Sequence, residues 1–166
     1  MLSWENFAMQ AQSKIEFELA EYVPLIKEVI ESGGEFRLFP RGTSMLPLLR
    51  QGKDSVILVK PGQKLKKRDI IFYKRPNGQF VLHRIVKAPK NQEYVLCGDN
   101  QTALEKGVTD SMVIAVVSAV YRAEKRIEKS RLSRRFYELV WCLMPFRRVW
   151  FFARRKMAGI KRIFIK

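Results

Sequence analysis

The sequence predicts a mainly β fold with helical ends, and three observations support this prediction. Short runs of β-branched and aromatic residues fill the middle of the chain, turn-forming dipeptides separate these runs, and helical periodicity is confined to the two ends. Many short strands at this spacing favour an antiparallel folded sheet or a barrel-like sheet.

The N-terminal residues 1–34 form a helical segment in this prediction. Ile15, Leu19 and Val23 recur at helical spacing, and further apolar residues follow Pro24. We expect Pro24 to begin a second helix, because proline is favoured in the first helical turn. Gly33-Gly34 is predicted to end it.

Residues 35–122 form the predicted central β domain. The expected strands cover residues 36–39, 55–59, 69–73, 80–86, 93–96 and 113–120. The turn residues between them are Pro61-Gly62, Pro76-Asn77-Gly78, Pro89-Lys90-Asn91 and Gly98-Asp99-Asn100.

Residues 123–166 form a basic, amphipathic helical tail in this prediction. The chain has 32 Lys and Arg against 16 Asp and Glu, and from Arg122 onward there are 15 basic and 3 acidic residues. This asymmetry indicates an anionic partner. A regular apolar stripe favours an anionic membrane surface over nucleic acid, and docking of the helix on the β domain is the alternative. The predicted membrane contacts are Arg147, Arg148, Trp150, Phe151, Arg154 and Arg155.

Composition argues against several other classes of protein. The chain has one histidine and two distant cysteines, Cys97 and Cys142, so neither a metal site nor a cofactor is expected. We find no signal peptide and no run of about 18 apolar residues. We therefore expect the protein in the cytoplasm or bound peripherally to the cytoplasmic face of a membrane. The oligomeric state stays open.

The sharpest local signal of chemistry is the segment Gly42-Thr43-Ser44-Met45-Leu46-Pro47. A glycine shortly before a serine lets the backbone turn tightly, so that the hydroxyl can face a groove. The backbone N–H of Ser44 is then also placed to stabilise an oxyanion. A serine hydroxyl is a weak nucleophile, however, and needs an adjacent base to accept its proton.

A candidate base lies in the predicted strand over residues 80–86. Strand alternation places His83 on one face with two apolar neighbours, at the edge of a core. Asp99 and Asp110 follow this strand, and either carboxylate is a candidate to orient the imidazole as the third member of a triad. Both aspartates are equally compatible with simple turn positions.

These segments, in this order, resemble the signal peptidase I superfamily of serine peptidases, whose relatives include repressors that cleave themselves. The resemblance covers roughly half of the chain and rests on four ordered blocks and a final apolar strand. These are Ser44-Met45-Leu46-Pro47, Arg68-Asp69-Ile70-Ile71, His83-Arg84-Ile85-Val86, Gly98-Asp99-Asn100 and Val113-Ile114-Ala115-Val116-Val117. The chain is similar to the form with a histidine base, found in the endoplasmic reticulum and in archaea. A histidine needs no large pKa shift to accept a proton at neutral pH.

The resemblance implies a serine endopeptidase that cleaves signal or leader-type peptides. Ser44 takes the position of the nucleophile, His83 that of the base, and Asp99 and Asp110 those of the acidic residues. The substrate would be an extended peptide bound as an added strand and cleaved after small residues such as alanine.

Two alternatives keep the fold but change the function. The family often has an oxyanion-donating serine where this chain has Gly42, with Thr43 as the available substitute. That difference favours a catalytically degenerate, peptide-binding or regulatory protein. The other alternative is a repressor-like protein that cleaves itself.

Overall fold

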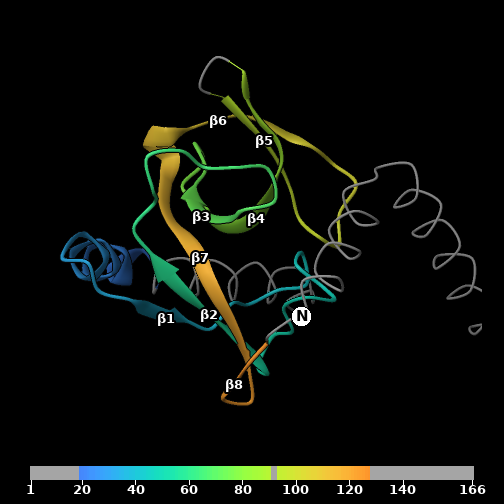
Figure 1. Cartoon of the computed structure of the whole chain (residues 1–166). Helices are drawn as coiled ribbons and strands as arrows, with labels where there is room; N and C mark the ends of the chain where they lie inside the picture. The colour runs from blue at the N-terminus through green and yellow to red at the C-terminus, as the bar shows by residue number, and fades with distance from the viewer. Residues whose placement is uncertain (1–18, 91–92, 128–166) are drawn as a thin grey trace, which may run out of the picture.

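A computed structural model describes residues 19–90 and 93–127 of the chain (Figure 1). Residues 19–31 are helical, and the strands of the described region are all antiparallel to their neighbours. The strands are β1 Phe36–Leu38, β2 Asp54–Val59, β3 Ile70–Lys74, β4 Phe80–Lys90, β5 Glu93–Cys97, β6 Glu105–Thr109, β7 Val113–Arg122 and β8 Lys125–Arg126. A short 3-10 helix, η1, spans Asp110–Met112 between β6 and β7.

The sheet has the strand order β1-β2-β7-β3-β4-β5-β6, with β8 paired to β7. The long strand β7 joins the two halves, because it pairs with β2 along one edge and with β3 along the other. This architecture confirms the predicted mainly β fold. The sequence analysis missed β6 and β8, because β6 contains a single apolar side chain, that of Val108, and β8 contains none.

Two hydrophobic clusters lie on opposite faces of β3, as strand alternation requires. Ile70 and Phe72 belong to the first cluster, whereas Ile71 and Tyr73 belong to the second. The second cluster also contains Ile85 of β4, which shares its face with His83. The imidazole therefore lies on the side of β4 that faces the second cluster.

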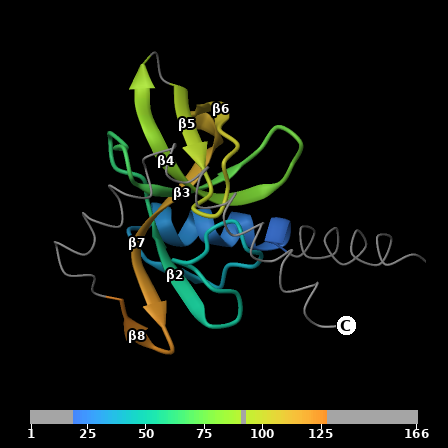
Figure 2. The same ribbon diagram turned by 90° about the vertical axis from the view of Figure 1, so that its right-hand side faces the viewer.

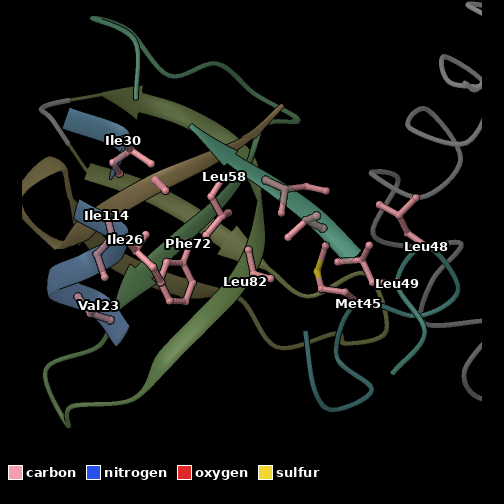
Figure 3. Packing of buried hydrophobic residues seen from close by; sticks show 13 residues of the cluster. Val23, Ile26, Ile30, Met45, Leu48, Leu49, Leu58, Phe72, Leu82 and Ile114 are labelled. Carbon is pink, nitrogen blue, oxygen red and sulfur yellow. The ribbon is translucent and has the colours of Figure 1, made fainter. Parts of the chain in front are cut away.

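The helical residues 19–31 pack on the first cluster. Figure 3 shows Val23 and Ile26 beside Phe72, and the same cluster continues to Met45 and the other loop residues that follow Ser44. The helix and the sheet therefore share one core. Both overall views show the helix next to the sheet (Figure 2).

Pro24 does not begin a helix, contrary to the prediction from sequence. Residues 19–23 are already helical, and the helix continues without a break to residue 31. One uninterrupted helix aligns Val23, Ile26 and Ile30 on a single buried stripe, at successive spacings of three and four residues. Burial of this stripe explains why the helix runs through the proline.

The tail and the first residues lie outside the described part of the chain. This applies to the predicted membrane contacts, Arg147, Arg148, Trp150, Phe151, Arg154 and Arg155, and to Cys142. Membrane contact therefore stays a prediction. Within the described ranges, no helix has the length and apolar character needed to cross a membrane.

Candidate active site

Ser44 lies in the loop between β1 and β2, where local contacts hold it half-buried. Gly42 has a φ of 86°, a left-handed conformation that glycine adopts without a steric penalty. The Gly42 N–H donates a hydrogen bond of 2.8 Å to the Gln51 side chain. Immediately after Ser44, the Met45 side chain is buried in the first cluster. The serine is thus fixed between a tight turn and a core anchor.

The far end of this loop is fastened by Asp54, which is 1% exposed. Its carboxylate accepts hydrogen bonds from the Arg50 N–H at 2.8 Å and from Arg122 Nε at 2.8 Å and Nη2 at 3.1 Å. Arg122 lies on β7, so this contact joins the loop to the central strand. Sequence analysis did not assign this role to Asp54.

His83 is 2% exposed, and a specific hydrogen-bond network defines its orientation. Its Nδ1 lies 3.2 Å from the Tyr73 hydroxyl and 3.4 Å from Glu105 Oε2. The Tyr73 hydroxyl donates to the same Glu105 oxygen at 2.7 Å. Since this donation uses the only phenolic proton, the tyrosine oxygen is left to accept from Nδ1–H. Nε2 then carries the lone pair that a general base requires.

Charges and burial act together on this network. Burial lowers the pKa of His83 to about 4, a shift that the Glu105 charge opposes and the Arg75 charge reinforces. Burial likewise raises the pKa of Tyr73, so the phenol keeps its proton. For Glu105, burial would raise the pKa, but hydrogen bonds from Arg75 and Tyr73 outweigh it and lower the pKa. The result is a neutral imidazole beside a charged carboxylate at neutral pH.

Arg75 holds Glu105 in place. Its guanidinium binds both carboxylate oxygens, with Nε–Oε1 at 2.8 Å and Nη2–Oε2 at 2.7 Å. Nη1 donates to Gln79 Oε1 at 3.0 Å, which fixes the guanidinium at the β3–β4 turn. This bidentate geometry is the strong form of an arginine–carboxylate pair. Glu105 therefore has a defined position from which to orient the Tyr73–His83 pair.

The Gly98-Asp99-Asn100 turn brings Ser44 next to His83. The Asn100 N–H donates to the Ser44 carbonyl oxygen at 2.6 Å. A Cβ atom on Gly98 would lie 2.7 Å from that carbonyl oxygen and 3.0 Å from His83 Nε2. The Ser44 carbonyl oxygen and His83 Nε2 thus both lie next to the Cα of Gly98, and only glycine, which has no Cβ, leaves room for them there.

The structure pairs both candidate aspartates with side chains other than that of His83. The carboxylate of Asp99 is bound by Arg84 on β4, at 2.8 Å and 2.7 Å, in a buried pair. Asp110, in η1, accepts a hydrogen bond of 2.5 Å from Tyr94 on β5. The carboxylate hydrogen-bonded to Tyr73 and closest to the Nδ1 side of His83 is that of Glu105. Asp99 instead supports the turn that contacts Ser44.

Sequence reasoning missed Tyr73, Arg75 and Glu105. A signal for Tyr73 was available, because alternation along β3 places it on the same face as Ile71, the residue that pairs with His83. Glu105 gave no comparable signal, since it begins the weakly apolar strand β6. Thr43 is exposed, and the roles of its side chain and of the Ser44 N–H as oxyanion donors stay predictions.

Ser44 and His83 line the same pocket, which has a volume of about 420 Å³. The remaining walls come from the helical segment, the loop after β1, the β3–β4 hairpin and Gln101. A serine, a neutral imidazole and a cavity of this volume therefore coincide. Within the described ranges, no group of three or more histidine, cysteine or acidic side chains is arranged to hold a metal ion.

One comparison with known proteins gives a match. A family model described as Peptidase S24-like matches residues 4–118, which includes the Ser44 loop, His83 and Glu105. No curated protein and no solved structure matches the chain.

Proposed function

The chain belongs to the Peptidase S24-like family, and from this premise we propose that it is a serine peptidase with Ser44 as nucleophile and His83 as general base. The observation that carries the proposal is the orientation of His83. Tyr73 and Glu105 occupy the Nδ1 side of the ring. Nε2 lies next to Gly98, as does the Ser44 carbonyl oxygen.

In the acylation step, Ser44 Oγ attacks the carbonyl carbon of the scissile peptide bond while His83 Nε2 accepts the hydroxyl proton. The imidazolium then gives this proton to the leaving amine as the C–N bond breaks. The Glu105 carboxylate lowers the energy of the transient imidazolium through its charge, and Tyr73 keeps the ring oriented.

In the deacylation step, a water molecule replaces the amine. His83 Nε2 takes a proton from this water as its oxygen attacks the acyl ester, and returns the proton to Ser44 Oγ when the ester bond breaks. Both steps use the neutral imidazole that burial maintains at neutral pH. Serine, histidine, substrate and one water molecule suffice for this sequence of proton transfers.

We further propose that the substrate is an extended peptide of signal or leader type. Residues 80–83 of β4 pair with β3 along one edge, whereas pairing with β5 begins at Arg84. No described strand pairs with the second edge of residues 80–83, so a peptide could add there as a strand beside the pocket. A peptide bound there would run past His83.

An active-site acylator tests the proposal directly. We would expose the wild-type protein to a fluorophosphonate and to a penem, with and without anionic lipid, and locate the adduct by mass spectrometry. Labelling at Ser44 is expected, with none in Ser44→Ala. His83→Gln should lower the labelling rate at least 100-fold, and Glu105→Gln about tenfold. Ser118→Ala removes an exposed serine elsewhere on the sheet and is the matched control.

Three results would contradict the proposal in whole or in part. Folded wild-type protein that stays unlabelled under all conditions would favour the peptide-binding alternative, for which the glycine at position 42 is the specific observation. Equal labelling of wild type and His83→Gln would remove the histidine from the mechanism. Accumulation of a cleaved form of the chain itself, blocked in Ser44→Ala, would favour the self-cleaving alternative.

A further inference from the structure

The pocket beside Ser44 has a larger apolar lining than cleavage after small residues, as the family resemblance implies, would require. Its walls include Leu49, Phe72 and Leu82, which are buried members of the first hydrophobic cluster. Tyr22 and Phe39 also line it, with exposed fractions of 55% and 61%. The volume of about 420 Å³ falls within the range of roughly 300–1,000 Å³ typical of pockets for small organic ligands.

An alanine side chain would leave most of this apolar space occupied by water. A leucine or phenylalanine side chain would displace that water and contact the apolar lining. Complete burial of such a side chain favours binding by roughly 10- to 100-fold over an exposed one. The lining therefore favours a bulky aliphatic or aromatic substrate side chain.

The charged side chains that line the pocket are all basic. The lining contains Arg41 and Arg75, and no aspartate or glutamate among the described residues. Arg75 is occupied by Glu105 and Gln79. Arg41 is exposed, and no other residue of the described chain forms an ion pair or hydrogen bond with its guanidinium. It lines the same pocket as Ser44, so a cation with no partner among the described residues shares the pocket with the proposed nucleophile.

We propose that the substrate is a peptide that places a bulky aliphatic or aromatic side chain in this pocket and an acidic side chain against Arg41. The proposal rests on the peptidase function above. Because Arg41 lines the same pocket as the apolar residues, we expect the acidic residue within about two positions of the apolar one, a span of about 7 Å in an extended chain. A guanidinium binds a carboxylate with two parallel hydrogen bonds, and the net charge of +16 attracts acidic peptides over longer distances.

Digestion of a peptide library tests this specificity across many sequences at once. A mixture of synthetic peptides of random sequence is digested with wild type and with Ser44→Ala, and the cleaved bonds are identified by mass spectrometry. Arg41→Glu is compared with Lys64→Glu, which makes the same charge change at an exposed residue outside the pocket. Fluorophosphonate labelling of Ser44 is measured in parallel.

The expected Ser44-dependent cleavages share leucine, methionine or an aromatic residue at one position and aspartate or glutamate within two positions of it. Arg41→Glu should lower cleavage of the acidic peptides about fivefold or more relative to Lys64→Glu. Labelling at Ser44 together with preferential cleavage at alanine, or with no change in Arg41→Glu, would overturn the specificity proposal alone. Absence of labelling would overturn the peptidase function, and the specificity proposal with it.

Discussion

Acidification changes the protonation of His83 differently in the folded and the unfolded chain. An unfolded histidine binds a proton near its ordinary pKa of 6.5. In the folded protein burial lowers the pKa of His83 to about 4. The Glu105 charge opposes this shift, and the Arg75 charge adds to it. Between these two values the unfolded chain binds more protons than the folded chain. The free energy of unfolding therefore falls as the pH falls, by roughly 3 kcal/mol over the whole window.

Urea unfolding followed by circular dichroism measures this effect. Around pH 5 we expect wild type to lose about 1.4 kcal/mol of unfolding free energy per pH unit from His83 alone. His83→Gln should lack this contribution. Glu105 and Asp54 have lowered pKa values in the folded protein. Their effect on the free energy of unfolding therefore begins only as the pH approaches the ordinary carboxylate pKa, at the lower end of the window. Identical slopes for wild type and His83→Gln would refute the reasoning.

The same pKa governs the proposed reaction. Because acylation needs the neutral imidazole, the labelling rate of Ser44 should stay high as the pH falls through 6.5 and reach half its maximum near pH 4, if the protein is still folded there. The measurement is the rate of fluorophosphonate labelling between pH 4 and pH 8, with circular dichroism at each pH. Half-maximal labelling near pH 6.5 would show that the catalytic imidazole is solvated.

Three further predictions concern the supports of the site. Gly98→Ala should slow labelling of Ser44 at least tenfold, because the new Cβ would lie 2.7 Å from the Ser44 carbonyl oxygen. The control is Gly62→Ala, whose new Cβ would have no atom within 4 Å. Asp99→Ala should lower the free energy of unfolding by about 3–5 kcal/mol in urea titrations, because Arg84 would be left as a buried charge without this partner. Tyr73→Phe removes the hydroxyl between His83 and Glu105 and should slow labelling about tenfold at unchanged fold, as judged by circular dichroism.

Each of these predictions has an outcome that contradicts it. Equal labelling rates for Gly98→Ala and Gly62→Ala would mean that the turn does not set the position of Ser44. If Asp99→Ala abolished labelling but left the stability of the fold unchanged, Asp99 would act in the chemistry rather than in the support of the turn. A Tyr73→Phe protein as reactive as wild type would show that the hydroxyl does not orient the imidazole.

Patterns that are local in sequence predicted most of the fold. The alternation of residues 80–86 and the turns between the β-branched runs predicted strands that the structure contains, because strand period and turn chemistry depend on neighbouring residues. The motif around Ser44 predicted a tight turn, and Gly42 adopts the left-handed conformation there. Strand β6 escaped prediction, because Val108 is its only apolar residue.

The partners of His83 could be identified only from the tertiary structure. Tyr73, Glu105 and His83 come from β3, β6 and β4, and β5 separates β4 from β6 in the sheet order. Curvature of the sheet, which no local pattern encodes, brings the start of β6 to the same side of His83 as Tyr73. The sequence by itself determined most of the strands, the serine turn and the place of the histidine on its strand, since these follow from residues close together in the chain. Which carboxylate approaches the histidine depends on contacts between strands that are distant in sequence. Packing of the whole sheet places Glu105 next to His83.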